Sequence, residues 1–395
     1  MKVEVEGGEE GKNTTEEEQK YEWWVPISYT SRSEKMFEDA QPKLWFNKET
    51  TIPDPAKPED WLLINLQMAG TYHVRYDQAN LKLLKEALNS SREEIPILNR
   101  MQLVLDYGLY ALSGLEPVPQ VLELMDFLAD EKHFAPWAAG LRSLWRMDQR
   151  LRGTQTGDKL KDRIRRLLSP QLSSLGLRTR KGDTVPVIRH RRQVVRHACL
   201  YKLADCVRRA QRLFTKWTDQ TDPDKVNPIP PDLRFTVYCT ALRTGKEDHL
   251  TFLQQRALQS KEPLHRDTMF TALGCFENYE VLYSFMESKL ENSTVTRHDF
   301  TKLMQGLVQY NENIGPVLQF MERSMVKMKS STNKKLRWNQ TMLRDLSQQI
   351  YDVEQLGQFK SLIGASKPWS KSEIAELQRM VEHNASWREK NKNIL

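Results

Sequence analysis

Residues 97–128 have the sequence ILNRMQLVLDYGLYALSGLEPVPQVLELMDFL, and this stretch decides the class of fold. Its apolar residues recur every three or four positions, which is the period of an amphipathic helix. Gly114 is suited to end a first helix, and Pro117 and Pro119 are suited to begin a second one. The stretch therefore predicts two successive helices, whose apolar faces contain Ile97, Met101, Val104, Leu105, Gly108, Leu112, Val118, Val121, Leu122, Met125 and Leu128.

Similar helical segments, separated by short loops, follow as far as the C-terminus. The chain shows no strict sequence repeat, so their arrangement is inferred from the succession of helices alone. We expect residues 78–395 to form an α-helical superhelix of HEAT-like helix pairs.

Strand patterns precede these helices. Residues 23–30 are aromatic and β-branched, and residues 44–46 are Leu-Trp-Phe. Residues 61–65 have the pattern of a buried strand, and residues 70–76 have the pattern of its hairpin partner. We expect residues 21–77 to form a small incomplete β-sandwich, which makes the whole chain mainly α.

The N-terminal residues 1–20 are acidic and polar, and we expect them to be disordered. The alternation within Lys2–Glu6 also permits a short edge strand. The segment has neither the basic start nor the apolar core of a signal peptide. No apolar run in the chain approaches the roughly 18 residues that a transmembrane helix needs.

The net charge of the chain is +7 for 395 residues, which is modest and spread over most of the sequence. This balance permits nucleic-acid binding but does not favour it. We therefore expect no nucleic-acid partner.

Cysteines and glycosylation sequons point to the secretory pathway. The number of cysteines is even, and paired cysteines are typical of oxidising compartments. Five Asn-X-Ser/Thr sequons add a weak signal in the same direction. The cysteines are Cys199, Cys206, Cys239 and Cys275, and the sequons begin at Asn13, Asn89, Asn292, Asn339 and Asn384, of which the last four are our glycosylation candidates. Because no signal peptide is present, we interpret the chain as lacking the N-terminal part of its parent protein.

Several short motifs occur in a fixed order along the chain. They are WVPISYT (24–30), GTYHVRYD (70–77), NRMQL (99–103), PW (136–137), NPIPPDLR (227–234), VYC (237–239), ALGC (272–275), RHD (297–299) and NIG (313–315). Together they resemble the C-terminal portion of the aminopeptidase N family of zinc aminopeptidases, which are gluzincins. The resemblance covers roughly residues 21–395.

The chain departs from the family pattern at a few positions. His73 and Arg75 stand where the family usually has Arg and Asn. Leu105 replaces the first acid of a usual acidic pair, and Asp106 keeps the second. These departures concern the packing of strands and helices rather than membership of the family.

The resemblance implies the end of a β-sandwich domain followed by a helical domain like that of the endoplasmic reticulum aminopeptidases. In the family, this helical domain forms a bowl that closes the peptide-binding chamber of the catalytic domain. The implied function is therefore a non-catalytic lid of an enzyme that trims N-terminal residues from peptides. The implied partners are the catalytic zinc domain and a peptide substrate, with dimerisation left open. The implied location is extracellular or lumenal, at the cell surface in the parent enzyme.

The resemblance also implies two disulfides, Cys199–Cys206 and Cys239–Cys275. The alternative is four reduced cysteines packed as small apolar groups in helix cores. The first pair sets a geometric condition, because seven residues of unbroken helix separate two Cα atoms by about 10.5 Å. A disulfide needs about 7 Å or less, so a helix has to break between Cys199 and Cys206.

Catalytic motifs are missing from the sequence. The family binds zinc through H-E-x-x-H, which places two imidazoles one helical turn apart, and through a later glutamate. No two of the eight histidines here are spaced by four, and the substrate-binding G-x-M-E-N is also missing. No nucleophile elbow or phosphate-binding loop replaces them. We expect no catalytic residue, no metal ligand and no cofactor in this chain, the zinc ion belonging to the catalytic domain of the parent.

A basic stretch at residues 178–197 has two interpretations. The first is a patch for phosphate or nucleic acid. The second, which we favour, is a solvated helix with its arginines in water and an apolar face of Ile188, Val194, Val195 and Ala198.

The main alternative for the whole chain is a stand-alone helical-repeat module that binds a protein or peptide without chemistry. A fragment of a longer gene product with no role of its own is a third interpretation.

Overall fold

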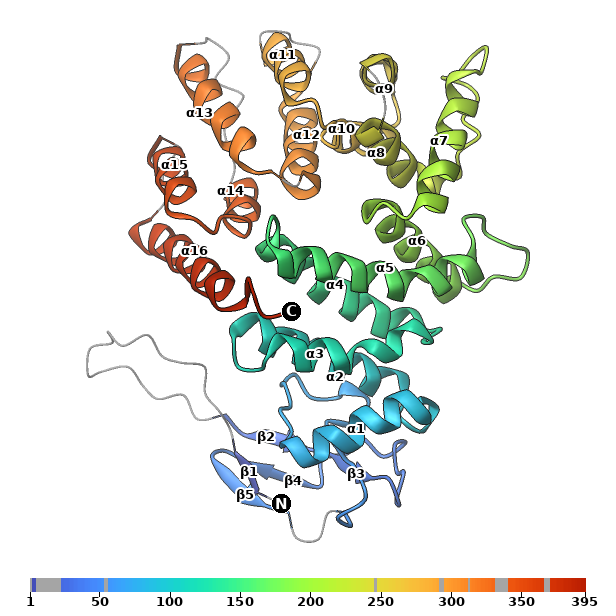
Figure 1. Ribbon diagram of the computed structural model, residues 1–395, viewed down its shortest axis with the longest axis vertical. Coiled ribbons are helices and arrows are strands. Elements are labelled where there is room, and N and C mark those ends of the chain that lie inside the picture. The colour runs from blue at the N-terminus through green and yellow to red at the C-terminus, as the bar shows by residue number, and fades with distance from the viewer. Residues whose placement is uncertain are drawn as a thin grey trace. The chain divides into compact units, whose positions relative to one another are not determined.

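The computed structural model describes residues 2–4, 23–52, 56–244, 247–290, 295–311, 313–330, 340–365 and 370–395 (Figure 1). The chain divides into two compact units, residues 1–144 and 145–395. The division falls within helix α4 (Phe134–Leu151). The first helices thus lie in the same unit as the strands, and the expected domain border near Asp77 stays a prediction.

The first unit begins with three pairs of short antiparallel strands. Strand β1 (Lys2–Glu4) pairs with β5 (Glu49–Thr51), so the permitted edge strand near the N-terminus is present. The other residues of 1–20, for which we expect disorder, lie outside the described part of the chain. The other pairs are β2 (Val25–Ile27) with β4 (Leu44–Phe46), and β3 (Tyr29–Ser31) with β6 (Leu62–Ile64). Helices predominate elsewhere, so the mainly α class with a small β portion is confirmed.

The predicted hairpin between residues 61–65 and 70–76 is wrong. Strand β6 pairs with β3, and residues 70–76 form no strand. The backbone N–H of Val74 donates to Asp106 Oδ2 at 3.0 Å, and that of Tyr76 donates to the Tyr107 hydroxyl at 3.0 Å. Because helix side chains satisfy these backbone donors, the segment follows the helix instead of a neighbouring strand.

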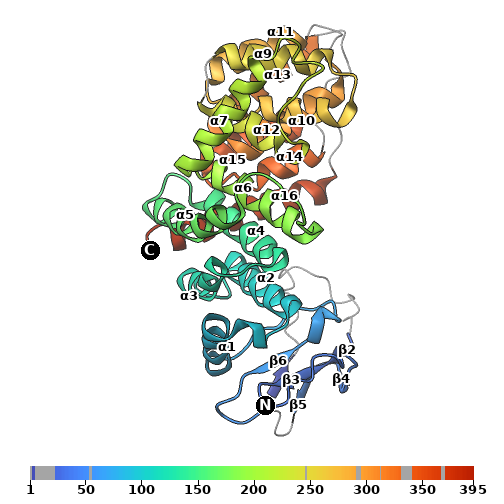
Figure 2. The ribbon, with the colours of Figure 1, turned by 90° about the vertical axis from the view of Figure 1, so that its right-hand side faces the viewer.

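Both predicted helices of residues 97–128 are present, although the second ends earlier, at Leu124. Helix α2 (Ile97–Ser113) ends at Gly114, whose φ of 81° is the left-handed conformation expected there. Helix α3 (Val118–Leu124) then begins with a proline in its first turn. In Figure 2 the strands lie to one side of α1 (Gln78–Ser90). Short 3-10 helices cover Leu66–Met68, Arg92–Glu94 and Asp126–Ala129.

The second unit is built from helices. They are α5 (Gln155–Leu175), α6 (Val185–Leu200), α7 (Ala204–Thr218), α8 (Arg234–Thr244), α9 (Glu247–Gln259), α10 (Pro263–Leu273), α11 (Tyr279–Leu290), α12 (Arg297–Tyr310), α13 (Gly315–Ser330), α14 (Gln340–Ser347), α15 (Val353–Ala365) and α16 (Lys371–Asn391), with a 3-10 turn at Pro231–Leu233.

From α8 onward these helices form two rows. Helices α8, α10, α12, α14 and α16 pack on one another in turn, and α11, α13 and α15 pack in a second row. In Figure 1 the second unit curves as an arc, with α8, α10 and α12 nearer its inside than α9, α11 and α13. The unit is thus a curved array of helix pairs, and its likeness to HEAT repeats stays a prediction.

The last helix returns to the segment that begins the second unit. Arg388 of α16 donates to the carbonyl of Arg150 at 2.6 Å. The Arg150 guanidinium lies over the Trp387 ring, 5.2 Å from its centre. Lys159 Nζ donates to the carbonyl of Leu395 at 2.6 Å. The first and last parts of the array are therefore joined.

Arg152 makes a second connection across the array. Its guanidinium donates to the carbonyl of Asn311 at 2.7 Å and to Gln349 Oε1 at 3.1 Å. The Asn311 amide in turn donates to the carbonyl of Gly274 at 2.7 Å, and the Gln349 amide donates to the carbonyl of Val308. One buried arginine thus links residues at the ends of α4, α10, α12 and α14.

Two glycines allow α10 and α12 to approach closely. A Cβ on Gly306 would collide with the carbonyl oxygen of Thr271, and a Cβ on Gly274 would collide with the backbone of Leu307. This close approach gives the glycine of the ALGC motif a packing role.

Gly306→Ala should destabilise the chain, because the added methyl forces two helix backbones apart. We expect a loss of about 1–3 kcal/mol in the free energy of unfolding, measured by urea denaturation. Gly357→Ala is the matched control, since Gly357 lies within α15 with open space around its Cα. That variant should be neutral or stabilising by up to about 1 kcal/mol. Equal effects of the two substitutions would contradict the close packing of α10 on α12.

Candidate functional site

Within the described ranges, no three His, Cys, Asp or Glu side chains are grouped so as to hold a metal ion. The same ranges contain no helix with the length and apolarity that a membrane crossing requires.

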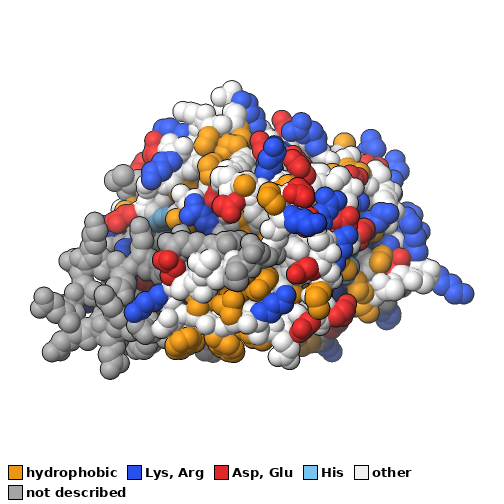
Figure 3. Space-filling view, turned by 90° about the horizontal axis from the view of Figure 1, so that it is seen from below, with side chains coloured by type: hydrophobic (Ala, Val, Ile, Leu, Met, Phe, Trp, Pro, Cys, Tyr) orange, Lys and Arg blue, Asp and Glu red, His pale blue; other side chains and the backbone are white. Residues whose placement is uncertain are grey.

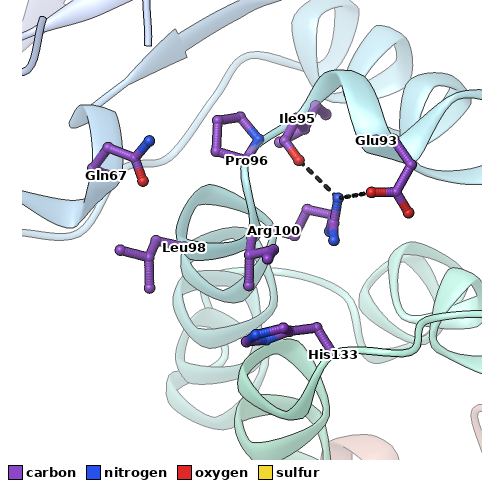
Figure 4. Close-up of a pocket in the computed structure, with 8 residues that line it drawn as sticks. Gln67, Glu93, Ile95, Pro96, Leu98, Arg100 and His133 are labelled. Atoms are coloured by element: carbon purple, nitrogen blue, oxygen red, sulfur yellow. Dashed lines mark hydrogen bonds and ion pairs between the residues drawn. The ribbon is translucent and has the colours of Figure 1, made fainter. Parts of the chain in front are cut away.

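A cavity of about 540 Å³ lies at the start of α2 in the first unit (Figure 4). It is lined by Gln67, Glu93, Ile95, Pro96, Ile97, Leu98, Arg100 and His133. Figure 4 shows the Arg100 side chain directed toward Ile95 and Glu93. Its Nη1 donates to the Ile95 carbonyl at 2.9 Å, and its Nε lies 2.8 Å from Glu131 Oε2.

The polar residues beside this cavity hold a turn of the backbone in place. Arg100 and Glu131 are both buried, and each charge is compensated by the other. The neighbouring Asn99 accepts from the backbone N–H of Gln67 at 3.0 Å and donates to the carbonyl of Asn65 at 3.1 Å. The NRMQL motif therefore joins the segment after β6 to α2, and its Asn99 and Arg100 position backbone rather than a reacting group.

The two departures from the family pattern in residues 70–77 have partners of their own. His73 Nδ1 lies 2.6 Å from Asp106 Oδ1. Burial raises the pKa of Asp106, against the lowering effect of its hydrogen bonds to Val74 and His73. Arg75 Nε lies 2.8 Å from Glu116 Oε1. The substituted residues thus connect the segment to α2 and to the loop after it.

An aromatic cluster lies in the second unit beside the disulfide Cys239–Cys275. Its members come from α4, α6, α8, α12 and the loop just after α10, and they are Trp145, Arg196, His197, Leu200, Phe235, Cys239, Cys275 and Tyr310. The Trp145 ring stacks on Tyr310 with centres 5.9 Å apart and meets His197 edge-on at 6.0 Å. The Arg196 guanidinium lies over Phe235, 4.9 Å from the ring centre.

Burial changes the acid–base properties of two residues in this cluster. Burial lowers the pKa of Arg196 to about 10, with a smaller contribution from the charge of Arg192. Burial also lowers the pKa of His197 to about 4, although its Nδ1 hydrogen bond to the Gln193 carbonyl at 2.9 Å acts in the opposite direction. The imidazole is therefore neutral at physiological pH, and its role is packing.

Both cysteine pairs are disulfide-bonded, and none of the four cysteines is free. The Cα atoms of Cys199 and Cys206 are 5.1 Å apart. The helix break that this distance requires is present, because α6 ends at Leu200 and Lys202 has a φ of 59°. Cys239 lies within α8 and Cys275 lies just after the adjacent helix α10, with Cα atoms 5.2 Å apart.

The sequons lie in different environments. Asn89 is exposed near the end of α1. Asn384 is only 1% exposed, and its amide donates to the carbonyl of Ser347 at 3.3 Å. The asparagines at positions 13, 292 and 339 lie outside the described residues.

The basic stretch is only partly the solvated helix that the sequence favours. Val194, Val195 and Ala198 are buried as expected, and Arg189 and Arg192 are exposed. Arg191 and His190, however, are each only 1% exposed. Arg191 pairs with Asp183 at 2.8 Å and donates to the carbonyl of Leu175 at 3.0 Å. Its partners lie outside the helix, so helical periodicity alone gave no sign of its burial.

An exposed aromatic surface, which the sequence did not indicate, is formed by two tryptophans just before β2 and one in β4. Trp23, Trp24 and Trp45 are 71%, 62% and 59% exposed. Trp45 pairs with Pro26 in the sheet, and strand alternation places Trp24 on the same face as Pro26. Hydrophobic side chains also gather at the surface in the view of Figure 3. Their aromatic character predicted strands but gave no information about which face would be covered.

The buried state of His197 predicts a pH dependence of stability. The unfolded chain binds a proton at this residue with a pKa of about 6.5, whereas the folded chain does so at about 4. The unfolded state therefore takes up more protons as the pH falls, and the free energy of unfolding decreases from pH 6.5 toward pH 4. The decrease approaches about 1.4 kcal/mol per pH unit within that window.

Urea denaturation of the wild type and of His197→Gln between pH 7 and pH 5 measures this contribution. We expect a shallower pH dependence in the variant, even if the variant is less stable at pH 7. Identical slopes in the two proteins would show that His197 is not held neutral by burial.

Similarity to known proteins is concentrated in relatives that are much longer than this chain. Aminopeptidase N of Plutella xylostella is 26% identical over 305 residues, which is 76% of this chain and 32% of the relative. Aminopeptidase N of Bos taurus is 26% identical over 294 residues, which is 73% of this chain and 30% of the relative. Aminopeptidase N of Homo sapiens is 24% identical over 308 residues, which is 76% of this chain and 32% of the relative. The chain thus spans about a third of the length of the curated relatives it matches.

A sequence profile of one protein family covers most of the chain. The ERAP1-like C-terminal domain matches residues 61–384, from the residue before β6 into α16. This range contains most of the motifs that suggested the family, together with both disulfides. The protein therefore belongs to the family of the ERAP1-like C-terminal domain, in agreement with its similarity to the C-terminal part of aminopeptidase N.

Proposed function

We propose that this chain is the non-catalytic C-terminal part of a zinc aminopeptidase and closes the chamber in which a catalytic part trims N-terminal residues from peptides. The observation that carries the proposal is the family match over residues 61–384, in a chain that spans about a third of its aminopeptidase N relatives. In this proposal the zinc ion is held by the catalytic part, because the sequence has no H-E-x-x-H motif.

The architecture of the second unit suits a lid. A lid limits substrate size and excludes water only if its wall keeps its shape. Two disulfides, the Arg152 connection and the contact of α16 with Arg150 all restrain the curved array. The proposed peptide chamber would be bounded by the inside of this arc.

The exposed tryptophan surface of the first unit suits contact with the catalytic part. Large aromatic side chains in water on a small sheet are costly, and clusters of them mark interaction sites. Trp23, Trp24 and Trp45 are all more than half exposed. We assign this surface to the interface with the catalytic part, which the relatives' greater length can supply.

Immunoprecipitation with antibodies against the whole chain, from its natural source, tests the proposal. The precipitate is run on a denaturing gel and assayed with aminoacyl p-nitroanilides, with and without a zinc chelator. We expect a polypeptide of at least twice the 46.3 kDa of this chain, or a stable complex of that size, with chelator-sensitive activity. A single 46 kDa species without activity would reject the proposal and favour the stand-alone binding module.

We also propose that the parent protein matures in the secretory pathway, as the two disulfides and the sequons suggest. Expression behind a signal peptide, followed by glycopeptide mass spectrometry, should find a glycan on the exposed Asn89. Asn384 should carry none, because its side chain is buried and bonded to backbone in the folded chain. Occupancy of Asn384 with Asn89 bare would contradict this assignment.

A further inference from the structure

A cavity of about 440 Å³ in the second unit is lined largely by cations. Its lining comes from two segments, the loop after α5 and one side of α7. The lining residues are Leu175, Gly176, Leu177, Arg178, Arg180, Arg209, Arg212, Leu213 and Lys216. Five of the nine are basic, and none is acidic.

Local structure brings the two segments together. Gly176, with a φ of 63°, ends α5 and turns the chain so that Arg178 and Arg180 face α7 across the cavity. Along α7, Arg209, Arg212 and Lys216 are spaced by three and four residues and therefore share one side of the helix. They extend over about 10 Å, since each residue advances a helix by about 1.5 Å.

Several of these charges have no carboxylate partner. Arg209 pairs with Asp205 at 2.9 Å, and the nearby Asp183 is taken by the buried Arg191 at 2.8 Å. Arg178, Arg212 and Lys216 form no ion pair with any residue in the described part of the chain. Cations held close together repel one another, and a bound anion removes that repulsion.

We propose that this cavity binds a segment of a linear sulfated polysaccharide. The cations are spread along the helix rather than directed at one point, so they match several anionic groups on a chain better than one phosphate or sulfate ion. Arginine guanidinium groups hold such oxyanions through paired hydrogen bonds. The leucines of the lining offer apolar contact to the C–H faces of sugar rings.

Two observations favour a sulfated glycan over nucleic acid. No aromatic residue lines the cavity, and single-stranded nucleic acids are usually bound by stacking of bases on aromatic rings. In addition, the chain carries two disulfides, which persist in oxidising compartments outside the cytosol, where sulfated glycans occur. This inference is independent of the lid function, because the cavity lies between α5 and α7 and involves no catalytic part.

Titration calorimetry of the full chain with a heparin hexasaccharide tests the site. The variant is Arg178→Gln/Arg212→Gln, which removes one unpaired cation from each wall. The control is Arg189→Gln/Arg192→Gln, which removes two exposed arginines of α6 that do not line the cavity and gives the same change in net charge. We expect the cavity variant to bind about tenfold more weakly at about 0.15 M salt, with the control within about twofold of the wild type.

The salt dependence and two competitors complete the test. Affinity should fall steeply with added salt in the wild type and less steeply in the cavity variant, because fewer ionic contacts are lost. Inorganic sulfate should compete only at far higher concentration than the hexasaccharide. Equal weakening of both variants, equal competition by sulfate ion, or tighter binding of a single-stranded oligonucleotide of the same charge would each overturn the proposal.

Discussion

The second unit depends on the hydrogen bonds that the guanidinium of Arg152 donates to Asn311 and Gln349. This guanidinium lies in the protein interior and reaches residues 159 and 197 positions later in the chain. The side-chain amides of Asn311 and Gln349 donate in turn to the carbonyls of Gly274 and Val308. Each buried polar group left without its partner costs about 1–3 kcal/mol, so the network favours one arrangement of the helices over slightly shifted ones.

Much of the fold could be predicted from local sequence. The period of residues 97–128, with Gly114 and the two prolines, predicted α2, its end at Gly114 and the start of α3. The predicted second helix extends past the end of α3, because residues Asp126–Ala129 form a 3-10 helix. The separation of Cys199 from Cys206 required a helix break, which the structure places at Lys202. These predictions succeeded because helix ends, and the Cα–Cα distance that a disulfide between nearby cysteines allows, depend on residues close together in the sequence.

Predictions from the sequence were wrong where the interaction partners lie in another element of the fold. Residues 70–76 alternate like a strand, but Asp106 and Tyr107 of α2 take their backbone donors. Arg191 looked like a solvated arginine, yet it pairs with Asp183 across the turn before α6. The family motifs indicated the family without revealing what each motif does in the structure. In the structure, Asn99 bonds backbone and Gly274 allows close helix packing. The period of the sequence did not indicate that the tryptophans would be exposed.

The return of α16 to the start of the second unit has a consequence for how that unit unfolds. An open array of helix pairs has two free ends, and it can fray from either of them one repeat at a time. Here Arg388 and Lys159 fasten the last residues to the first part of the array, which leaves neither end free. The unit should then lose structure as a whole, so that partial opening is rare and proteases find few intermediate forms to cut.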